Sequence, residues 1–334
     1  MSSVPLQLLT NSRMRTEREC QRKHDFMYRQ GIRPITAGEA LYFGSLMHLC
    51  LEAWWKAFME GRNADALPDA IAMAVREEDA YKREQMLAVI IGYHQYYAGA
   101  MTEYKVLAVE KQFTAPLINP STQAASRTWQ LAGKIDVIVE RGGRVAIIEH
   151  KSSSESIDSD ADLYWQRLQM DHQSSMYVVG AETLEYGEVK DVIYDVVKKP
   201  QQRPLKATPE DSRKYKANGE LYANQRDVDE TAEEYGARIA ADIESRPGHY
   251  YVRRLVPRLE GQILDFLYDA WQTGRDIRDA ELAGRSIRNP EACNRYSVCP
   301  FFQACVNGLD PMTLPGFTKS DNVHPELKEE PPNA

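Results

Sequence analysis

The chain has 334 residues, of which 43% are hydrophobic, and a formal net charge of −8 at pH 7. This length allows one large domain with insertions or two modest ones, and the apolar fraction is enough for a buried core. No stretch approaches the roughly 20 apolar residues that a membrane helix needs, and residues 1–20 lack the apolar centre of a secretory signal. We therefore expect a cytoplasmic protein without a membrane partner, and the net charge gives no general preference for nucleic acid.

The N-terminal third of the chain is expected to be helical. Residues 12–30, which contain Cys20, are polar and basic. The next stretch, 38–61, has apolar residues and His48 recurring at helical spacing, and this pattern predicts a long helix. Residues 64–103 predict two further helices.

From about residue 104 the pattern changes to strands. Predicted strands, rich in β-branched and aromatic residues, cover 104–113, 129–140, 144–151 and 189–199. A Ser/Asp-rich loop at 152–162 and an amphipathic helix at 163–180 separate the last two strands. Residues 200–222, rich in Pro, Lys and Arg, predict a loop over the surface.

Helices are expected again at 228–245 and 256–283, and the segment 310–334 has many prolines and acidic residues with little to bury. Such a composition predicts a mobile tail. We find no internal repeat. The expected parts of the chain are an entry segment, a helical region, a core, a C-terminal helical and cysteine region, and the tail, at 1–37, 38–103, 104–222, 223–309 and 310–334.

Cysteines gather near the C-terminal end. Cys293, Cys299 and Cys305 lie within CNRYSVCPFFQAC, whereas Cys20 is far away in the sequence and Cys50 lies inside an apolar helical run. Clustered cysteines in a cytosolic chain indicate a metal rather than disulfides. We interpret Cys50 as a core residue.

The strands on either side of RGGR, residues 141–144, form a predicted hairpin. A two-residue glycine turn would pair Arg141 with Arg144. Counting back along both strands, Asp136 then lies directly across from Glu149, on the same face and about 4.5–5.5 Å away at Cβ.

Two carboxylates that face each other repel, so this pairing is unfavourable in a purely structural sheet. A divalent cation between Asp136 and Glu149 would remove the conflict, because it prefers hard oxygen ligands. Lys151 points to the same face and could orient or deprotonate a water, or stabilise charge on a phosphate. The alternative is a solvated polar face on an edge hairpin.

This arrangement resembles the PD-(D/E)XK nuclease superfamily, whose site combines an Asp on one strand with Glu-x-Lys on the next. Here Glu-x-Lys is EHK, and Ile135 precedes the Asp in place of Pro, as in many RecB-like members that read GKID. The resemblance implies an α/β fold with a restriction-endonuclease-like core, in which helices flank a mixed central sheet.

Upstream, the sequence GSLMH ends in His48. RecB-like nucleases have a similar Gly-x-x-x-His helix, and the resemblance makes His48 a metal ligand together with Asp136 and Glu149. Gly44 lets the helix approach the sheet closely. A histidine on an apolar helix face is otherwise a core residue, and that interpretation stays open.

Downstream, Gln173 and Tyr177 match the Gln-x-x-x-Tyr motif of RecB-like enzymes. An amide and a phenol can hold a water, a phosphate or Lys151 in place. The alternative is an ordinary helix face with Tyr177 packed on the sheet. Glu110 lies where some RecB-like members have an acid on the preceding strand, and we keep it as a candidate for substrate or supporting contacts.

The cysteines resemble a RecB-like subgroup, the AddB-type and CRISPR-adaptation nucleases, which bind an iron–sulfur cluster with one Cys before the core and three after it. The resemblance implies a 4Fe–4S cluster on four thiolates, with zinc as the alternative. The implied ligands are Cys20, Cys293, Cys299 and Cys305. A link from Cys20 to Cys293 closes a very long loop, which should stabilise the fold.

The predicted function is metal-dependent hydrolysis of DNA, from the ends of linear or single-stranded molecules, with Mg²⁺ or Mn²⁺. Catalytic roles fall to Lys151, Asp136, Glu149, Gln173 and Tyr177. The DNA-contacting residues that we expect, in basic segments, are Lys198, Lys199, Arg203, Arg253 and Arg254.

The chain lacks a Walker A motif, so we expect no motor of its own. This favours a phage or prokaryotic nuclease of recombination, replication or repair, with a separate helicase or single-strand annealing protein as a possible partner. Two alternatives stay open: a non-catalytic DNA-binding or scaffold module, and a nuclease subunit that is active only in a complex.

Overall fold

The computed structural model describes residues 5–35, 39–159, 162–295 and 297–327. At its centre is a six-stranded sheet, in which β3 (Tyr104–Ile118) pairs with β4 outside the main order. The main order is β1 (Gln7–Leu9), β4 (Ala125–Arg141), β5 (Arg144–Ser153), β6 (Val189–Lys198) and β7 (Tyr251–Leu255). β1 is parallel to β4 and β5 to β6, whereas the other pairs are antiparallel. The predicted mixed sheet is confirmed.

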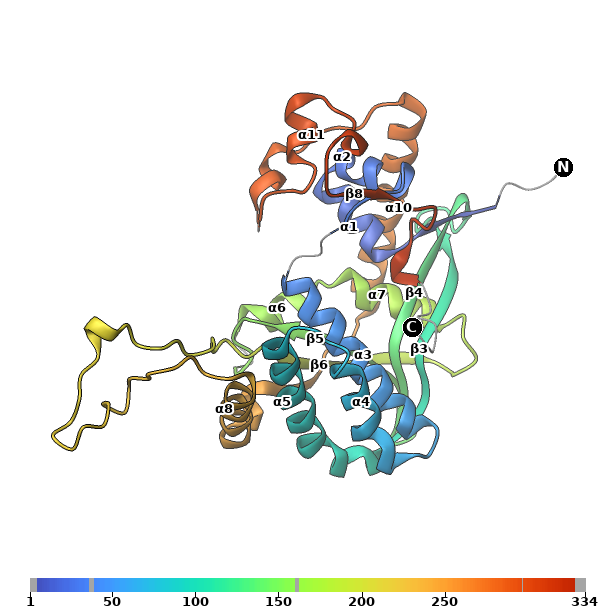
Figure 1. Ribbon diagram of the computed structural model, residues 1–334. Helices are drawn as coiled ribbons and strands as arrows, with labels where there is room; N and C mark the ends of the chain where they lie inside the picture. The colour runs from blue at the N-terminus through green and yellow to red at the C-terminus, as the bar shows by residue number, and fades with distance from the viewer. Residues whose placement is uncertain (1–4, 36–38, 160–161, 296, 328–334) are drawn as a thin grey trace.

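Helices cover both faces of the sheet (Figure 1). One hydrophobic core joins the sheet to α3 (Glu39–Met59), α4 (Ala66–Ala74), α5 (Ala80–Tyr97) and α8 (Ala232–Ser245). A second core joins the opposite face to α6 (Leu163–Leu168), α7 (His172–Ala181) and α10 (Glu260–Ala283). Short elements connect these parts: η2 (Asn63–Asp65), η3 (Ala98–Glu103) and α9 (Pro247–Tyr250).

The hairpin of β4 and β5 has the predicted register. Gly142 and Gly143 adopt positive φ angles of 57° and 76°, as a two-residue hairpin turn requires. Arg141 pairs with Arg144, and the pairing continues in step to Val137 and Ile148. This places Asp136 and Glu149 as the next opposed positions.

Two predicted helices are interrupted. The segment 163–180 forms α6 and α7, because Asp171 caps α7 by accepting a hydrogen bond from the Gln173 amide. The N-terminal stretch forms α1 (Asn11–Glu19), α2 (Gln21–His24) and the π-helix η1 (Asp25–Arg29), with Cys20 extended between α1 and α2.

Segments from the two ends of the chain pack together at the top of Figure 1. β2 (Ile32–Pro34) pairs with β8 (Phe317–Lys319), and both lie beside a small core of Phe26, Ile32 and Phe301. The other elements of this part are η5 (Pro290–Asn294), α11 (Phe302–Asn307), η6 (Pro311–Thr313) and η7 (Pro325–Leu327).

The described part of the tail differs from the mobile segment that we expected. Residues 310–327 contain β8, whose backbone pairs with β2, and Phe317 stacks on Phe301 at 5.1 Å between ring centroids. The few apolar residues in this segment thus suffice to hold it, because a partner strand satisfies its backbone groups. Residues 328–334 lie outside the described residues.

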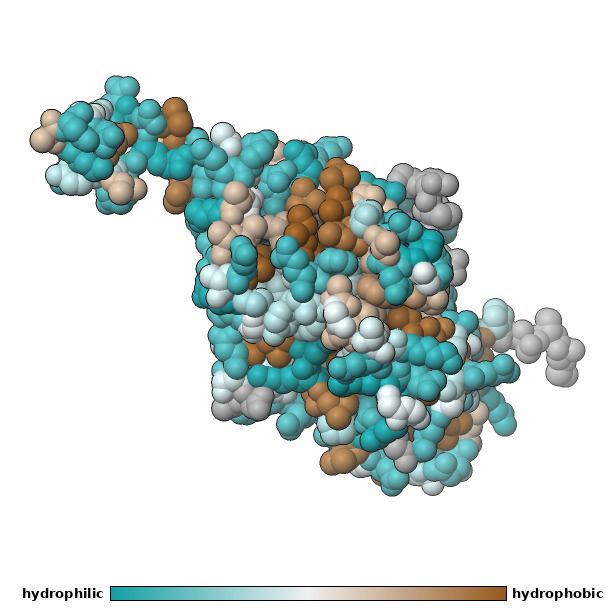
Figure 2. Space-filling view, turned by 90° about the horizontal axis from the view of Figure 1, so that it is seen from below, coloured by the Kyte–Doolittle hydropathy of each residue, from teal (hydrophilic) through white to brown (hydrophobic). Residues whose placement is uncertain are grey.

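Between β6 and α8 the chain forms a long arm that projects from the body (Figure 1, yellow). The arm contains η4 (Glu210–Ser212) and an isolated bridge between Tyr215 and Leu221. Figure 2 shows it as a mostly hydrophilic protrusion at the upper left. Of the helices in the described ranges, none has the length and apolar composition to cross a membrane.

Candidate active site

A cavity of about 850 Å³ opens where β3, β4 and β5 meet α3 and α7. Its walls also include Thr10 to Ser12 and Arg15 from the start of α1, and Pro325 to Leu327 of η7. The predicted residues His48, Asp136, Glu149, Lys151, Gln173 and Tyr177 all line this cavity. The structure therefore brings together residues that are spread from position 48 to position 177 of the sequence.

Three possible metal ligands converge in the cavity. One ligand atom each from His48, Glu110 and Asp136 lies within 4.8 Å of the others. The Nδ1 atom of His48 is 3.8 Å from Oδ1 of Asp136. An imidazole and two carboxylates at this separation are a suitable donor set for a divalent cation.

The backbone positions Asp136 and His48. Oδ2 of Asp136 accepts a hydrogen bond of 2.8 Å from the His150 amide, which fixes its carboxylate against β5. His48 lies on α3 one turn after Gly44, where a Cβ atom would meet the Ser152 hydroxyl at 3.2 Å. The absence of a side chain at Gly44 thus lets α3 approach the end of β5.

Glu110 reaches the site through an unusual backbone. Its neighbours Val109 and Lys111 pair with Val137 and Ile135, so Glu110 stands opposite Asp136. Its φ of 53° lies in the left-handed region, which a residue with a side chain enters at a cost of about 1–2 kcal/mol. Lys134 forms an ion pair with its carboxylate.

A chain of hydrogen bonds runs beside these ligands. Lys151 Nζ donates to Glu149 Oε1 and to Gln173 Oε1, both over 2.7 Å. Gln173 Nε2 in turn donates to the Tyr177 hydroxyl over 2.8 Å. Gln173 therefore fixes the ammonium group, and Tyr177 fixes Gln173.

Burial dominates the electrostatics of the acidic groups. It raises the pKa of Glu149 to about 8, an effect that Lys151 opposes and Asp136 reinforces. Burial and the facing Asp136 raise the pKa of Glu110 to about 7. Without a bound cation, the site thus resists carrying three negative charges at once.

The pKa values of the two basic groups, His48 and Lys151, shift in opposite directions. Burial lowers the pKa of His48, so its imidazole is neutral and has a free lone pair for a metal. Burial would also lower the pKa of Lys151, but Glu149 and Asp171 outweigh it and raise the pKa above the usual value. Lys151 is therefore a cation that can orient a water or stabilise an anion.

The predicted ligand set and the converging one differ in one member. His48 and Asp136 belong to both sets. The third predicted ligand was Glu149, whereas the third member of the converging group is Glu110, and Glu149 lines the same cavity. Oε2 of Glu149 is buried and has no hydrogen-bond partner. A buried carboxylate oxygen without a partner suits a cation in this cavity, because a buried polar atom without a hydrogen bond is otherwise costly.

Sequence reasoning gave Glu110 little weight and missed Arg15 and Glu52, which also line the cavity. Glu52 lies one turn after His48 on α3, so the helical spacing could have revealed it. Arg15 is exposed at the start of α1, and its only signal is the basic composition of residues 12–30.

One of the expected DNA-contacting residues, Arg253, has a structural role instead, and Arg254 beside it is partly exposed. The side chain of Arg253 is 9% exposed, with Nε 3.2 Å from the buried Asp195 and its guanidinium 3.7 Å from the ring centre of Tyr97. We withdraw Arg253 from the DNA-contacting set, because a buried and paired guanidinium offers no face to a phosphate. Arg254 stacks on Trp165 at 4.3 Å.

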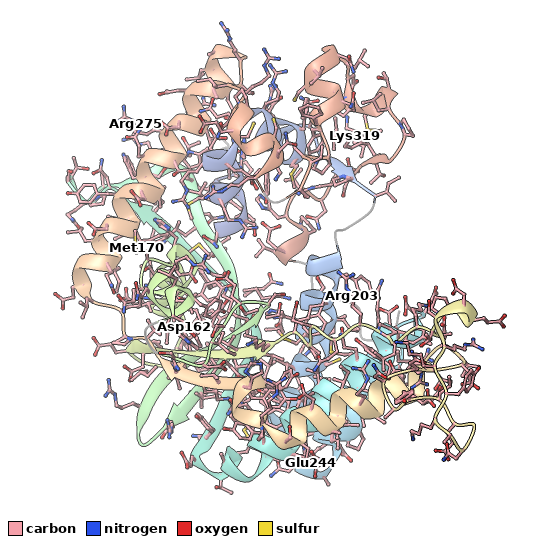
Figure 3. All side chains as sticks on the ribbon, turned by 90° about the vertical axis from the view of Figure 1, so that its left-hand side faces the viewer. Asp162, Met170, Arg203, Glu244, Arg275 and Lys319 are labelled. Carbon is pink, nitrogen blue, oxygen red and sulfur yellow. The ribbon has the colours of Figure 1, made fainter. Side chains whose placement is uncertain are left out.

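The other three expected DNA contacts lie where β6 enters the arm. Lys199 is partly exposed, and its ammonium is 5.4 Å from the ring centre of Phe43 on α3. Arg203 is exposed at the base of the arm (Figure 3). Lys198, in contrast, is buried.

The four cysteines of the predicted cluster line one pocket. Residues 286–289 hydrogen-bond to residues 19–22, for example from the Arg22 amide to the Ile287 carbonyl, and this brings Cys20 to the C-terminal cysteines. The pocket is lined by Cys20, Cys293, Cys299 and Cys305. All are free thiols, and Cys50 is fully buried in the core as expected.

Burial and the neighbouring cysteines act on the same thiols. Burial raises the pKa of Cys299 and of Cys305, and Cys20 and Cys293 raise both further. Four thiols that repel one another as thiolates suit a cationic ligand between them.

The family model of the PD-(D/E)XK nuclease superfamily matches residues 9–305. No curated protein matches the chain. A solved structure titled "Crystal structure of SSO0001" is similar, with 12% sequence identity and a TM-score of 0.27, over 68% of this chain and 73% of that chain.

Proposed function

Since the chain belongs to the PD-(D/E)XK nuclease superfamily, we propose that it is a Mg²⁺- or Mn²⁺-dependent exonuclease that degrades linear or single-stranded DNA. The superfamily implies a phosphodiester hydrolase with a DNA substrate. The metal preference, the attack from DNA ends and the RecB-like subtype are the parts that we add.

One observation carries the proposal. His48, Glu110 and Asp136 converge within 4.8 Å, in the same cavity as the paired Glu149 and Lys151. In a purely structural cluster Glu110 and Asp136 would still face each other, with their repulsion only partly offset by the Lys134 ion pair with Glu110 and by the His150 amide, which donates to Asp136. A cation-binding site explains why they do so.

The residues would divide the work as follows. His48, Glu110 and Asp136, with Oε2 of Glu149 and the His150 carbonyl, would hold the cation. When bound, a divalent cation polarises the phosphate and lowers the pKa of an attacking water. Lys151, held as an ammonium by Glu149 and Gln173, would position that water and offset negative charge in the transition state.

We also propose that Cys20, Cys293, Cys299 and Cys305 hold a 4Fe–4S cluster, with zinc as the alternative ligand. Four cysteines that line one pocket are a suitable donor set for either group. The bound group would have a structural role in linking Cys20 to the C-terminal part.

The cellular role that we infer is recombination, replication or repair in a prokaryotic or phage-infected cell. The resemblance to RecB-like nucleases and the lack of a Walker A motif support this role. A separate helicase or single-strand annealing protein would then supply suitable DNA ends. This partner is expected in the cytoplasm, with the nuclease.

The test is degradation of end-labelled linear single- and double-stranded DNA by anaerobically purified protein, with Mg²⁺, Mn²⁺ or a chelator. Lys151→Ala should abolish cleavage, whereas Lys105→Ala, which removes an exposed lysine paired with Glu140, should not. Metal-dependent loss of label from the ends supports the proposal. A wild-type protein that binds DNA without cutting it indicates the alternative, a binding module or a subunit that needs its partner.

A further inference from the structure

A second, smaller cavity lies at the end of β6, where the chain enters the arm. Its volume is about 360 Å³, and its walls include Lys198, Lys199, Gln201, Arg246 and His249. We refer to it as the Lys198 pocket. None of its lining residues belongs to the cavity that holds Asp136 and Lys151.

Lys198 is the unusual member of this pocket. It is 9% exposed, and within the described part of the chain its ammonium group has no hydrogen bond and no ion pair. The stem of Lys198 is buried, whereas its Nζ atom is not one of the buried side-chain atoms that lack a partner, so the ammonium opens on the pocket. Arg253, in contrast, has its guanidinium paired with Asp195. Lys198 thus offers three donors that the protein itself leaves unused.

The neighbouring charges do not satisfy Lys198. Arg246 is bound by Asp242 over 2.8 Å, and His249 lies 3.0 Å from Asp158, so each of these basic groups already has a carboxylate. Lys199 has an aromatic partner rather than an acid. The pocket therefore carries an excess of positive charge from Lys198 and Lys199, which suits an anion.

The pocket lies close to the catalytic lysine along the sheet. Lys151 pairs with Val196, and Ser153 pairs with Lys198 on the parallel strand β6. Lys198 is therefore one strand away from Lys151 and two residues further along, about 7 Å in the strand direction. Because paired residues on neighbouring strands point to the same face, both lysines belong to the same side of the sheet.

We propose that the Lys198 pocket binds a backbone phosphate of the DNA strand that is cut at the Lys151 site. The inference rests on the proposed nuclease function. Lys198 and Lys199 supply the positive charge, and the exposed Arg203 extends it to the base of the arm (Figure 3). The contact is to phosphate alone, so it adds affinity without sequence preference.

The test measures DNA affinity as a function of salt concentration, in chelator and in the Lys151→Ala background. Lys198→Met preserves the apolar stem and removes the charge, and Lys105→Met is the matched control at an exposed lysine. Each phosphate contact contributes about 0.7 to the slope of log K against log salt for single strands. Lys198→Met should weaken binding about tenfold and lower the slope by about this amount. Lys105→Met should leave both unchanged.

Protein stability separates a lost contact from a damaged fold. Lys198→Met keeps the buried apolar stem and removes only an unpaired ammonium, so its Tm should equal that of the parent protein. Weaker DNA binding at an undiminished Tm supports the proposal. An unchanged affinity and slope overturn it, and a lowered Tm overturns the premise that the ammonium is unpaired.

Inorganic phosphate distinguishes the source of the anion. One outcome would show that the pocket binds free phosphate and not DNA. Phosphate would then raise the Tm of the parent protein but not that of Lys198→Met, and the two proteins would bind DNA equally well. DNA cleavage is measured separately, with the protein that retains Lys151. If that protein cleaves DNA but Lys198→Met binds DNA as well as its parent, only the pocket proposal is refuted. If Lys198→Met weakens DNA binding but the protein with Lys151 does not cleave, only the nuclease proposal is refuted.

Discussion

Glu110 faces Asp136 across β3 and β4, with its backbone at a φ of 53° and a carboxylate oxygen within 4.8 Å of that of Asp136. Two features of this position raise the free energy of the folded state: the left-handed backbone of Glu110 and the repulsion between the two carboxylates. Residues persist in such conformations where the surrounding structure holds them, and they gather at functional sites. The arrangement is the basis for the first two predictions.

Replacing Glu110 by Gln should weaken metal binding. The amide removes one negative ligand and relieves the repulsion with Asp136, so the Mn²⁺ or Mg²⁺ concentration for half-maximal cleavage should rise at least about tenfold. Glu103→Gln, which changes an exposed carboxylate paired with Arg141, is the control. An unaltered metal dependence in Glu110→Gln would exclude Glu110 as a ligand.

Metal affinity should rise with pH between about 7 and 8. Burial raises the pKa of Glu110 to about 7 and that of Glu149 to about 8, so below this range a proton occupies these carboxylates and must leave before the cation binds. Calorimetric titration of the DNA-free wild-type protein with Mn²⁺ at several pH values, in buffers of different ionisation enthalpy, would measure both affinity and proton release. A pH-independent affinity without proton release would contradict the prediction.

Gln173 should affect the rate more than DNA binding. It accepts a hydrogen bond from Lys151 and donates one to Tyr177, so Gln173→Ala leaves the ammonium less well oriented. We expect cleavage at saturating DNA to fall about tenfold or more, with little change in affinity. Gln169→Ala, at an exposed position shortly before α7, should cleave like the wild type. A purely structural role for Gln173 would lower Tm and leave the rate of the folded fraction unchanged.

Asp195 should be essential for stability. It is fully buried, with Arg253 Nε at 3.2 Å, His150 Nδ1 at 3.2 Å and the Tyr93 hydroxyl as a donor. Asp195→Asn leaves Arg253 as an uncompensated buried charge, which costs about 3–5 kcal/mol of unfolding free energy.

The control for Asp195 is four residues earlier on the same strand. Asp191→Asn breaks an ion pair with Arg144, whose side chain is 70% exposed, and such pairs contribute up to about 1 kcal/mol. Urea unfolding of both variants would measure the difference. Equal losses would show that the Asp195–Arg253 pair is not the main support of β6 and β7.

The pocket cysteines should hold iron. Cys305→Ser should release iron and sulfide from anaerobically purified protein and lower its Tm, because the link between Cys20 and the C-terminal part is lost. Cys50→Ala, in the core, should retain the metal. Metal analysis that finds one zinc in place of iron would favour the alternative ligand, and an absence of both metals from the wild type would rule out a cluster.

The sequence predicted the hairpin of β4 and β5 well, because two glycines in a two-residue turn determine which residues pair. Local features decided this pairing, so it needed no knowledge of the tertiary structure. The same turn geometry places Asp136 opposite Glu149, as the observed register continues from Val137 and Ile148. His48, Gln173 and Tyr177 came from the family resemblance, and the structure places them at one cavity.

Features that depend on distant partners were not predictable. β2 and β8 have three residues each and pair across more than 280 positions, so neither has a pattern long enough to detect. Arg253 was expected on the surface because nothing in its neighbourhood reveals that Asp195 lies beside it. Glu110 gained its role from a backbone conformation that no propensity of glutamate suggests.

The wall of the active-site cavity has a consequence for protein synthesis. Thr10 donates a hydrogen bond of 2.5 Å to Glu326, and both residues line the cavity that holds Asp136 and Lys151. Domains fold progressively from the N-terminus as the ribosome releases them. The sheet, α3 and α7 therefore emerge well before residue 326, and for that period the cavity lacks this wall. Translation itself thus delays the finished nuclease site until almost the whole described chain has left the ribosome.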